Sequence, residues 1–391
     1  MEYQTFLLSE VGQIVSGATP KTSDAENFGG DIAWLTPADL SGYTEKYISH
    51  GARNITQKGY DGCSTQLMPA GTVLFSSRAP IGYVAIARNP ICTNQGFKSI
   101  IPNSNIDSEF LYYQLKYLKK QIQDMGSGTT FREISAKTLG KVNIVVPSLA
   151  EQKRIVARIE ELFSELDNGV ETLQKTKQQL AVYRQAVLKD AFSGCDKQAS
   201  VSSVCTHVTD GDHMPPPKAA SGIPFIMISN IDGNRIDFSD TAFVGRDYYE
   251  NIDSKRRPQV GDVLYSVTGS FGIPVLVDFE KEFCFQRHIA LLRPNDSILS
   301  RYLYYAMQAP EVYAQASEGA TGTAQKTVGL TVLRRILIPY TKSKLEQEEI
   351  VRDIENKMSV CDSIEKTVDT ALQQAEAMRQ TILKQAFEGR F

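Results

Sequence analysis

The densest group of possible metal ligands in the sequence lies between residues 205 and 213. This short stretch contains Cys205, His207, Asp210, Asp212 and His213. Thiolate, imidazole and carboxylate are common protein ligands of zinc, so a metal site is one interpretation. A structured loop is the other, because an Asp-Gly pair and three consecutive prolines at 215–217 are typical of turns. We favour the loop and predict no metal site in the chain.

Two glycine- and threonine-rich segments could bind phosphate through their backbone amides. These are GSGTT at 126–130 and GATGT at 319–323. Their ligand could be a nucleotide or the backbone of DNA, and we favour DNA. The segment GTAQKT at 322–327 lacks the glycine that precedes the lysine in a nucleotide-binding P-loop.

The sequence shows none of the short motifs that we associate with common enzyme chemistries. It has no GxGxxG turn, no HExxH and no GxSxG. Asn89-Pro90-Ile91 does not match the Asn/Asp-Pro-Pro-aromatic motif of enzymes that methylate base amino groups. The four histidines, at 50, 207, 213 and 288, leave few candidates for histidine catalysis. We therefore expect a binding protein that needs no cofactor of its own, with an enzyme as the alternative.

Composition is that of a globular protein in a reducing compartment. The 391 residues are 42% hydrophobic and 22% charged, which is ordinary globular usage. No run approaches the ~20 apolar residues of a membrane helix, and MEYQTFLLSEVGQ lacks the pattern of a secretory signal. The six cysteines form no CxxC pair, which favours free thiols. We expect a cytoplasmic protein with no membrane partner.

The net charge of −3 is distributed unevenly along the chain. Residues 1–149 carry a net charge of +1, residues 150–194 and 195–344 carry 0, and residues 345–391 carry −4. No segment has the strong positive charge of a protein that binds nucleic acid by phosphate attraction alone. DNA binding would therefore need a local basic face or a contribution from a partner.

Two segments that lie 195 residues apart repeat the same pattern. EQKRIVARIE at 151–160 matches EQEEIVRDIE at 346–355, and RQAVLKDAFSG at 184–194 matches RQTILKQAFEG at 379–389. Neither match needs a gap. Internal repeats indicate architectures that are built from copies of one unit. The chain is thus interpreted as two diverged copies of a globular domain followed by a long segment.

Each repeated segment has the apolar spacing of a long helix. Apolar residues recur at steps of three, four or seven, neither segment contains proline, and each ends in Phe-x-Gly. A helix of about 40 residues is roughly 60 Å long. We expect the two helices to pair with each other as an antiparallel coiled coil. The alternative is that each pairs with a second chain in a homodimer.

The intervening blocks repeat more loosely. Val73-Leu74-Phe75-Ser76 matches Val263-Leu264-Tyr265-Ser266, Cys92 matches Cys284, and Leu111-Tyr112-Tyr113 matches Leu303-Tyr304-Tyr305. Short apolar runs between Gly and Pro predict strands, with one helix near 107–124 and another near 299–316.

These patterns predict an α+β fold with pseudo-two-fold symmetry. Two similar domains, each a mixed β-sheet with helices, occupy residues 1–149 and 195–344. Two long helices, at 150–194 and 345–391, separate them and pair as an antiparallel coiled coil.

Several of these motifs resemble one known family. VSGATPKTSDAENFGGDIAWLTPADL (15–40) and TDGDHMPPPKAASGIPFIMISNI (209–231) are similar to openings of target-recognition domains. EQKRIV and EQEEIV are similar to entries into long helices of the same family. Together with the repeat, they resemble the specificity subunit of a type I restriction–modification system over essentially the whole chain. Asp212 departs from the pattern, because Thr is frequent there.

The resemblance implies a function in recognition only. Each domain would read one half of a split, asymmetric double-stranded DNA target, while the helices would act as a spacer and dock partners. Two methyltransferase subunits using S-adenosylmethionine would methylate adenine N6. Two restriction subunits using ATP and Mg²⁺ would translocate and cleave DNA. A recognition or scaffold module of another phage-defence system, without methylation, is the alternative.

Residue chemistry gives candidates for DNA contact, because Arg and Lys suit guanine or phosphate and hydroxyl groups suit phosphate. In the first domain we predict Lys21, Ser76, Arg78, Thr129, Thr130 and Arg132, all in loops at strand edges. In the second we predict His213, Lys218, Thr268, Ser270, Thr323 and Lys326 on the same grounds. Arg184 and Arg379 occupy matching helix positions and are predicted to serve packing or partner docking. Trp34 and Phe225 are expected in the core.

Overall fold

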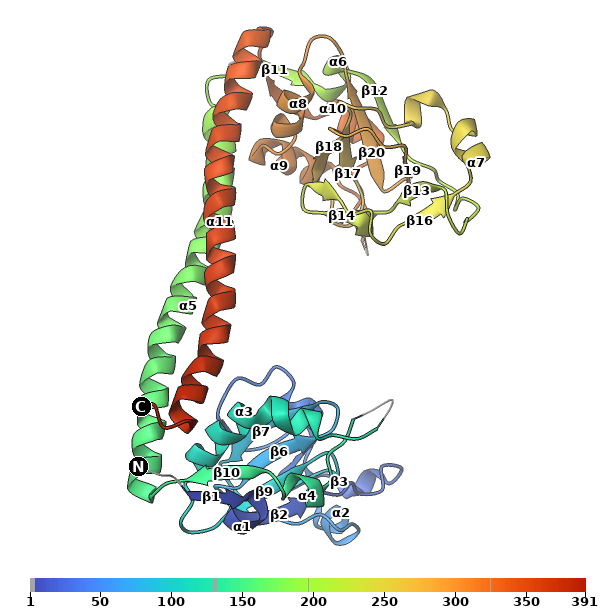
Figure 1. The fold of residues 1–391 in the computed structure, drawn as a ribbon. Coiled ribbons are helices and arrows are strands. Elements are labelled where there is room, and N and C mark those ends of the chain that lie inside the picture. Colours follow the sequence, from blue (N-terminus) through green and yellow to red (C-terminus); the bar gives the residue numbers. More distant parts are fainter. Residues whose placement is uncertain (1–3, 129–131, 196, 324) are drawn as a thin grey trace. The chain divides into compact units, whose positions relative to one another are not determined.

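The computed structural model describes residues 4–128, 132–195, 197–323 and 325–391. It divides into two compact units: unit 1 comprises Met1–Leu173 with Thr370–Phe391, and unit 2 comprises Gln174–Asp369. Each unit holds one globular domain and parts of two long helices, α5 (Leu149–Ala191) and α11 (Lys344–Phe387), as Figure 1 shows. Among the residues described, none of the helices combines the length and apolar character that a membrane span requires.

The domain of unit 1 is built on a five-stranded sheet of order β2-β9-β6-β7-β5. Helix α3 packs against strand β7 of this sheet. The strands are β1 (Gln4–Leu7), β2 (Gly12–Ser16), β3 (Phe28–Ile32), β4 (Trp34–Leu35), β5 (Tyr47–Ile48), β6 (Val73–Ser77), β7 (Ile81–Ala87), β8 (Cys92–Thr93), β9 (Lys98–Pro102) and β10 (Asn143–Val146). The helices are α1 (Leu8–Val11), α2 (Gln57–Asp61), α3 (Ser108–Asp124) and α4 (Ala136–Leu139), with 3-10 turns η1 (Ala25–Asn27) and η2 (Pro37–Leu40).

The domain of unit 2 has a four-stranded sheet of order β12-β20-β17-β18 and a three-stranded sheet of order β16-β13-β19. Its strands are β11 (Lys197–Ser200), β12 (Cys205–Asp210), β13 (Ile223–Ile226), β14 (Ile231–Asp232), β15 (Arg235–Ile236), β16 (Ala242–Val244), β17 (Val263–Ser266), β18 (Pro274–Leu276), β19 (Cys284–Phe285), β20 (Ile289–Pro294) and β21 (Leu337–Tyr340). Its helices are α6 (Val201–Val204), α7 (Arg246–Asn251), α8 (Ser300–Ala306), α9 (Pro310–Gly319) and α10 (Leu330–Arg335), with 3-10 turns η3 (Ile228–Asn230) and η4 (Ser254–Arg256).

The helix expected near 299–316 is two helices, α8 and α9. Pro310 begins α9. Proline has no amide hydrogen to continue a helix but fits its first turn, so the chain stops and restarts there. In unit 1 the matching helix α3 is unbroken, and the Asp107 carboxylate caps it by accepting from the amides of Glu109 and Phe110, both at 3.0 Å.

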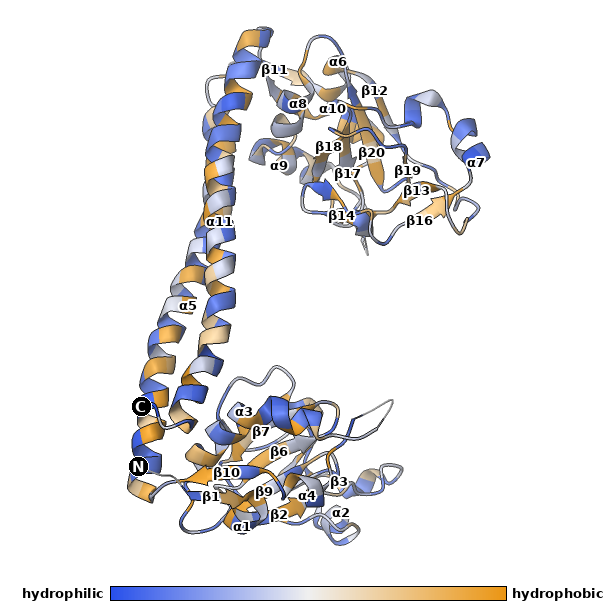
Figure 2. Ribbon diagram, in the orientation of Figure 1, coloured by the Kyte–Doolittle hydropathy of each residue, from blue (hydrophilic) through white to orange (hydrophobic). Residues whose placement is uncertain are grey.

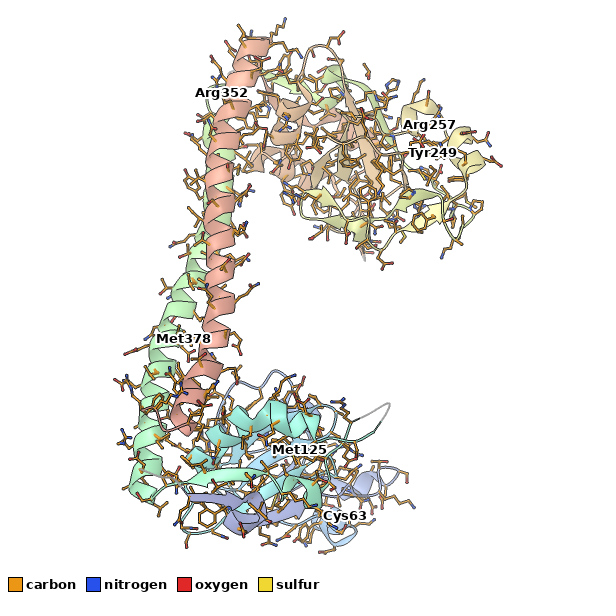
Figure 3. All side chains as sticks on the ribbon, in the orientation of Figure 1. Cys63, Met125, Tyr249, Arg257, Arg352 and Met378 are labelled. Carbon is orange, nitrogen blue, oxygen red and sulfur yellow. The ribbon has the colours of Figure 1, made fainter. Side chains whose placement is uncertain are left out.

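A buried heptad seam runs along each long helix. In α11 the residues buried at successive steps of seven are Ile354, Cys361, Val368, Ala375 and Ile382. The same spacing in α5 buries Ile159, Leu180 and Val187. Figure 2 shows the resulting alternation of apolar and polar positions along both helices. Met378, which lies outside the seam, is 53% exposed (Figure 3).

Within each unit, a segment of α5 lies antiparallel to a segment of α11. In unit 2, Arg184 pairs with Asp362 at 2.7 Å, and Lys177, seven residues earlier, pairs with Asp369, seven residues later, at 2.8 Å. In unit 1 the corresponding ion pair joins Arg379 to Asp167. Arg379 follows Arg184 by 195 residues, and Asp167 precedes Asp362 by the same number. The repeat therefore reproduces this contact, with the arginine on α11 and the aspartate on α5.

One buried glutamine ties each domain to the helix that follows it. In unit 1 the side-chain amide of Gln152 donates to the carbonyls of Asn105 (3.0 Å) and Pro147 (2.9 Å) and accepts from the amide of Asp107 (2.8 Å). In unit 2, Gln347 makes three bonds of the same kind. Both side chains are fully buried. The repeated Glu-Gln pattern therefore marks the junction between domain and helix.

The opposite helix also packs on each domain. The ring of Phe387, near the end of α11, lies 5.4 Å from that of Phe110 in unit 1. The ring of Phe192 lies 5.5 Å from that of Tyr302 in unit 2. Phe192 and Phe387 are again related by the 195-residue repeat. Each domain thus rests on the start of one long helix and the end of the other.

Candidate nucleic-acid interface

Each unit gathers four loops at one end of its main sheet, and together we call them the loop cluster of that unit. In unit 1 they comprise residues 17–21, 78–80 and 94–97, with 127–128 and 132–133 as the fourth. In unit 2 they comprise residues 211–218, 267–272 and 286–288, with 321–323 and 325–327 as the fourth. These loops come from distant parts of the sequence. The antiparallel pairing of β2 with β9, and of β12 with β20, brings the corresponding strand ends together.

Backbone hydrogen bonds join the loops of unit 2. The amide of Val267 donates to the carbonyl of His288 (2.9 Å), and its carbonyl accepts from the amide of Val328 (2.8 Å). The amide of Gly269 donates to the carbonyl of Lys326 (3.0 Å). These backbone bonds fix three loops to one another, and the exposed side chains of the loops, such as Ser270 and Lys326, point to solvent.

Unit 1 repeats this arrangement around Ser77. The amide of Ser77 donates to the carbonyl of Gly96 (2.7 Å), and its carbonyl accepts from the amide of Ile134 (3.0 Å). Two backbone bonds join Ser127 to Glu133, at 3.0 and 2.9 Å. The two loop clusters therefore share one backbone plan.

A matched glycine begins the first loop of each cluster. A Cβ atom on Gly17 would overlap the carbonyl of Thr93, and one on Gly211 would overlap the carbonyl of Phe285. Only glycine allows the backbones to approach this closely. The loops after β2 and β12 are consequently held against the strands that precede β9 and β20.

The expectation that Ser76 lies in an open loop is wrong. Ser76 is in strand β6 and is fully buried. Its hydroxyl donates to the carbonyl of Pro80 (2.7 Å) and accepts from the amide of Tyr83 (2.8 Å). Ser266 makes the same two kinds of bond in unit 2. Both hydroxyls shape the turn of the loop cluster from inside and do not present themselves to a ligand.

One other candidate of unit 1, Arg78, belongs to a partly buried group of charged side chains. Lys21 and Arg132 are exposed, whereas Arg78 lies 3.7 Å from the carboxylate of Glu133. Thr129 and Thr130 lie outside the described residues. Lys98, which our sequence analysis missed, is 3.9 Å from Glu133, and burial lowers the pKa of its ammonium group. The structure thus brings Arg78 and Lys98 to one carboxylate.

Four candidates of unit 2 lie on two adjoining loops. Ser270, Thr323 and Lys326 are exposed. Thr268 is only 6% exposed, and its hydroxyl oxygen accepts from the hydroxyl of Thr327 at 3.3 Å. Thr268 is therefore placed to hold Thr327 against the turn at 267–272, and its burial does not suit direct DNA contact.

His213 and Lys218 lie on the proline-containing loop of unit 2. Both are exposed, and the His213 ring lies 2.9 Å from the carboxylate of Asp210. Arg256 lies 3.6 Å from Asp210 and 3.7 Å from Asp212, so cations accompany both carboxylates. Cys205 is buried, which raises the pKa of its thiol to about 12 and keeps it protonated. These surroundings favour a structured loop over a metal site.

The residues at 286–288 belong to the same loop cluster and were not predicted. Arg287 is exposed and makes no side-chain hydrogen bond or ion pair within the described part of the chain. Burial lowers the pKa of the His288 imidazole, and Arg287 lowers it further. The match between Cys92 and Cys284 could have indicated this loop. Each cysteine lies shortly before a strand of the main sheet, β9 in unit 1 and β20 in unit 2, and the loop lies between them.

The edge of unit 2 beside this loop carries a second basic group. Figure 3 shows Tyr249 and Arg257 close together near α7, and the Arg257 guanidinium lies 5.8 Å from the ring centroid. The Arg257 carbonyl accepts from the side chain of Arg293, which pairs with the buried Asp262 at 2.7 Å. The buried ion pair anchors the segment that follows η4.

Arg184 and Arg379 pair with the opposite long helix and are not free side chains. Arg184 contacts Asp362 and Glu365, and the Arg379 guanidinium also lies 5.2 Å from the ring centroid of Phe163. Their side chains are 25% and 28% exposed. Both side chains therefore pack between the long helices of their unit, and a role in partner docking stays a prediction.

Fold and site together define a protein of two similar domains, each with its own loop cluster, joined through paired helices. The sequence pattern of the type I restriction modification DNA specificity domain matches residues 1–180 and 216–374. Because this match covers most of the chain, the protein belongs to that family.

Individual relatives agree with this assignment. The chain is 42% identical to the type I restriction enzyme MjaIX specificity subunit of Methanocaldococcus jannaschii over 187 residues, which is 47% of this chain and 42% of that subunit. It is 23% identical to the Escherichia coli EcoBI specificity subunit over 98% of this chain and 85% of that one. A chain from a solved type I R-M assembly is 19% identical and superimposes with a TM-score of 0.74 over 98% of this chain and 97% of that chain, which shows the same fold.

Proposed function

We propose that this chain is the DNA specificity subunit of a type I restriction–modification complex. Each loop cluster would read one half of a split double-stranded target. The observation that carries this proposal is the pair of loop clusters, which share one backbone plan but carry different side chains. Val267 and Ser77 occupy matching places in that plan, and their backbone groups make equivalent hydrogen bonds. Arg287 and Gln95 also occupy matching places, but the first side chain is a cation and the second is a neutral amide.

Two different loop clusters imply an asymmetric target. Sequence is read by side chains that reach base edges, while phosphate contacts fix position. Arg78 and Arg132 give unit 1 two guanidinium groups, whereas unit 2 offers His213, Arg287 and Lys326. Arginine suits guanine in the major groove, so these residues favour different half-sites. The near-neutral charge of both domains favours a contribution to phosphate binding from partners.

The partners in this proposal supply the chemistry. Two methyltransferase subunits would bind S-adenosylmethionine and methylate adenine N6, and two restriction subunits would use ATP and Mg²⁺. The target base would be turned into a methyltransferase pocket, so this chain would need no catalytic residue. Arg184 and Arg379 would shape the helix pair on which partners dock. Domain boundaries at 1–149, 150–194, 195–344 and 345–391 follow from the same proposal.

Selection from a random duplex library tests this function. The full chain, in complex with its methyltransferase subunit, should enrich duplexes that share two short, different motifs at a fixed spacing. Enrichment of one motif, or of none, would contradict recognition by two loop clusters. Binding without methylation of the enriched motif would favour a recognition module of another phage-defence system.

A further inference from the structure

A cavity of about 300 Å³ lies beside the loop cluster of unit 2. It is bounded by the loop at 211–218, strands β13 and β16, and the loop at 286–288. Its lining combines apolar and polar side chains, among them Phe225, Met227, Phe243, Lys218, Gln286 and Arg287. Its volume is at the small end of the range for ligand pockets.

Unit 1 has a buried tryptophan at the position that corresponds to Phe225. Trp34 pairs in parallel with Cys92, as Phe225 pairs in parallel with Cys284, so the two aromatic residues occupy equivalent positions. The Trp34 indole N–H donates to the carbonyl of Ala18 at 3.1 Å and thereby reaches the first loop of its cluster. Phe225 is smaller and has no N–H group, and its ring lines the cavity.

Two polar side chains of the cavity wall have no side-chain hydrogen bond within the described part of the chain. The side chains of Gln286 and His288 both line the cavity. Neither makes a side-chain hydrogen bond to any residue that the structure describes. A primary amide offers two donors and one acceptor, and a neutral imidazole offers one of each. Burial lowers the pKa of His288 and so favours its neutral form at pH 7.

The geometry points to a site for one nucleobase of the DNA half-site, rotated out of the duplex stack. This inference rests on the proposed function. The apolar side chains Phe225, Met227 and Phe243 in the lining suit the face of a base, which duplex DNA exposes only when a base leaves the stack. The Gln286 amide can pair with the edge of that base. Lys218 and Arg287 are exposed cations at the rim, where the attached phosphates would lie.

A mismatch scan detects such a site. The full chain with its methyltransferase subunit is bound to duplexes in which each position of one half-site is mismatched in turn. A mismatched base leaves the stack more easily, so binding should tighten about tenfold at the captured position. A mismatch at the adenine to be methylated should also tighten binding, because the methyltransferase captures that base. A variant of the cavity is therefore needed to identify the position that the cavity itself captures.

Phe225→Trp is that variant, because it copies the residue at the corresponding position of unit 1. It should abolish the tightening at one position and weaken binding of that half-site about tenfold. Discrimination in the other half-site should stay unchanged, which serves as the internal control. If Phe225→Trp lowers the melting temperature strongly, Gln286→Ala replaces it. Gln286→Ala keeps the cavity and should reduce discrimination among the four bases at the same position.

Three results would overturn the inference. One is a scan in which the methylated adenine alone responds to mismatch. Another is a tightening that persists in Phe225→Trp, or base discrimination that is unchanged in Gln286→Ala. A third is that Phe225→Trp no longer associates with the methyltransferase but discriminates among bases as before. That result would assign the cavity to an apolar side chain of the partner. Failure of the wild-type complex to select any split motif would instead reject the proposed function itself.

Discussion

Replacing Gln152 with methionine should loosen one domain from its long helix and leave the other domain intact. Methionine has a similar length but no group that can replace the amide. The substitution leaves the amide of Asp107 and the carbonyls of Asn105 and Pro147 without their present partner. Gln152 is fully buried, so water does not readily take its place.

The expected magnitude follows from three lost hydrogen bonds. Each intramolecular hydrogen bond contributes about 1 kcal/mol net, so the loss is about 3 kcal/mol. That corresponds to roughly a hundredfold increase in the equilibrium constant for local opening. Because the chain contains two units, one global unfolding free energy would mix two transitions, and a local measurement is needed.

Hydrogen exchange monitored by mass spectrometry supplies that local measurement. Gln152→Met should accelerate exchange in peptides covering the start of α3 by up to about a hundredfold, with unit 2 unchanged. Gln347→Met should do the reverse, affecting the start of α8 alone. Gln178→Met, at an exposed position of α5, is the matched control and should change neither. Equal acceleration in both units, or none in either, would refute the account of the repeated glutamine.

The remaining predictions concern the loop clusters. Exchange of residues 1–149 for a foreign recognition domain should alter one half of the target, and alteration of both halves would contradict modular reading. Lys326→Ala should weaken binding to all sequences alike and reduce the salt dependence by about one phosphate contact, as titrations at several salt concentrations would show; a switched target with unchanged affinity would exclude this role. Gly211→Ala should displace the loop at 211–218 and reduce specific binding in a filter assay, and unchanged affinity would show that the close approach is dispensable.

The order of domains and long helices could be predicted because the sequence contains the same motifs twice. The EQ-x-x-IV and RQ-x-x-LK patterns, 195 residues apart, predicted two copies of one unit with two long helices. The heptad spacing predicted the seam that buries Cys361 and Val368. These features depend on local periodicity and repetition, which a single sequence contains.

The details of the loop clusters could not be predicted because they depend on contacts between distant segments. Ser76 has the chemistry of a phosphate ligand, but its hydroxyl is used inside a turn that involves Pro80 and Tyr83. The loop containing Arg287 has no motif of its own and is placed by strand pairing. Phe225, which lines the cavity, stands where the other copy has Trp34, a difference that appears only once the two domains are compared.

The methylation pattern produced by this chain tests the central claim most directly. Co-expression with its methyltransferase subunit in a host without DNA methylation, followed by single-molecule sequencing, maps N6-methyladenine at base resolution. We predict a split, asymmetric motif with one methylated adenine in each half. A stable complex of the two proteins that leaves no bipartite mark would contradict guidance of methylation by the two loop clusters.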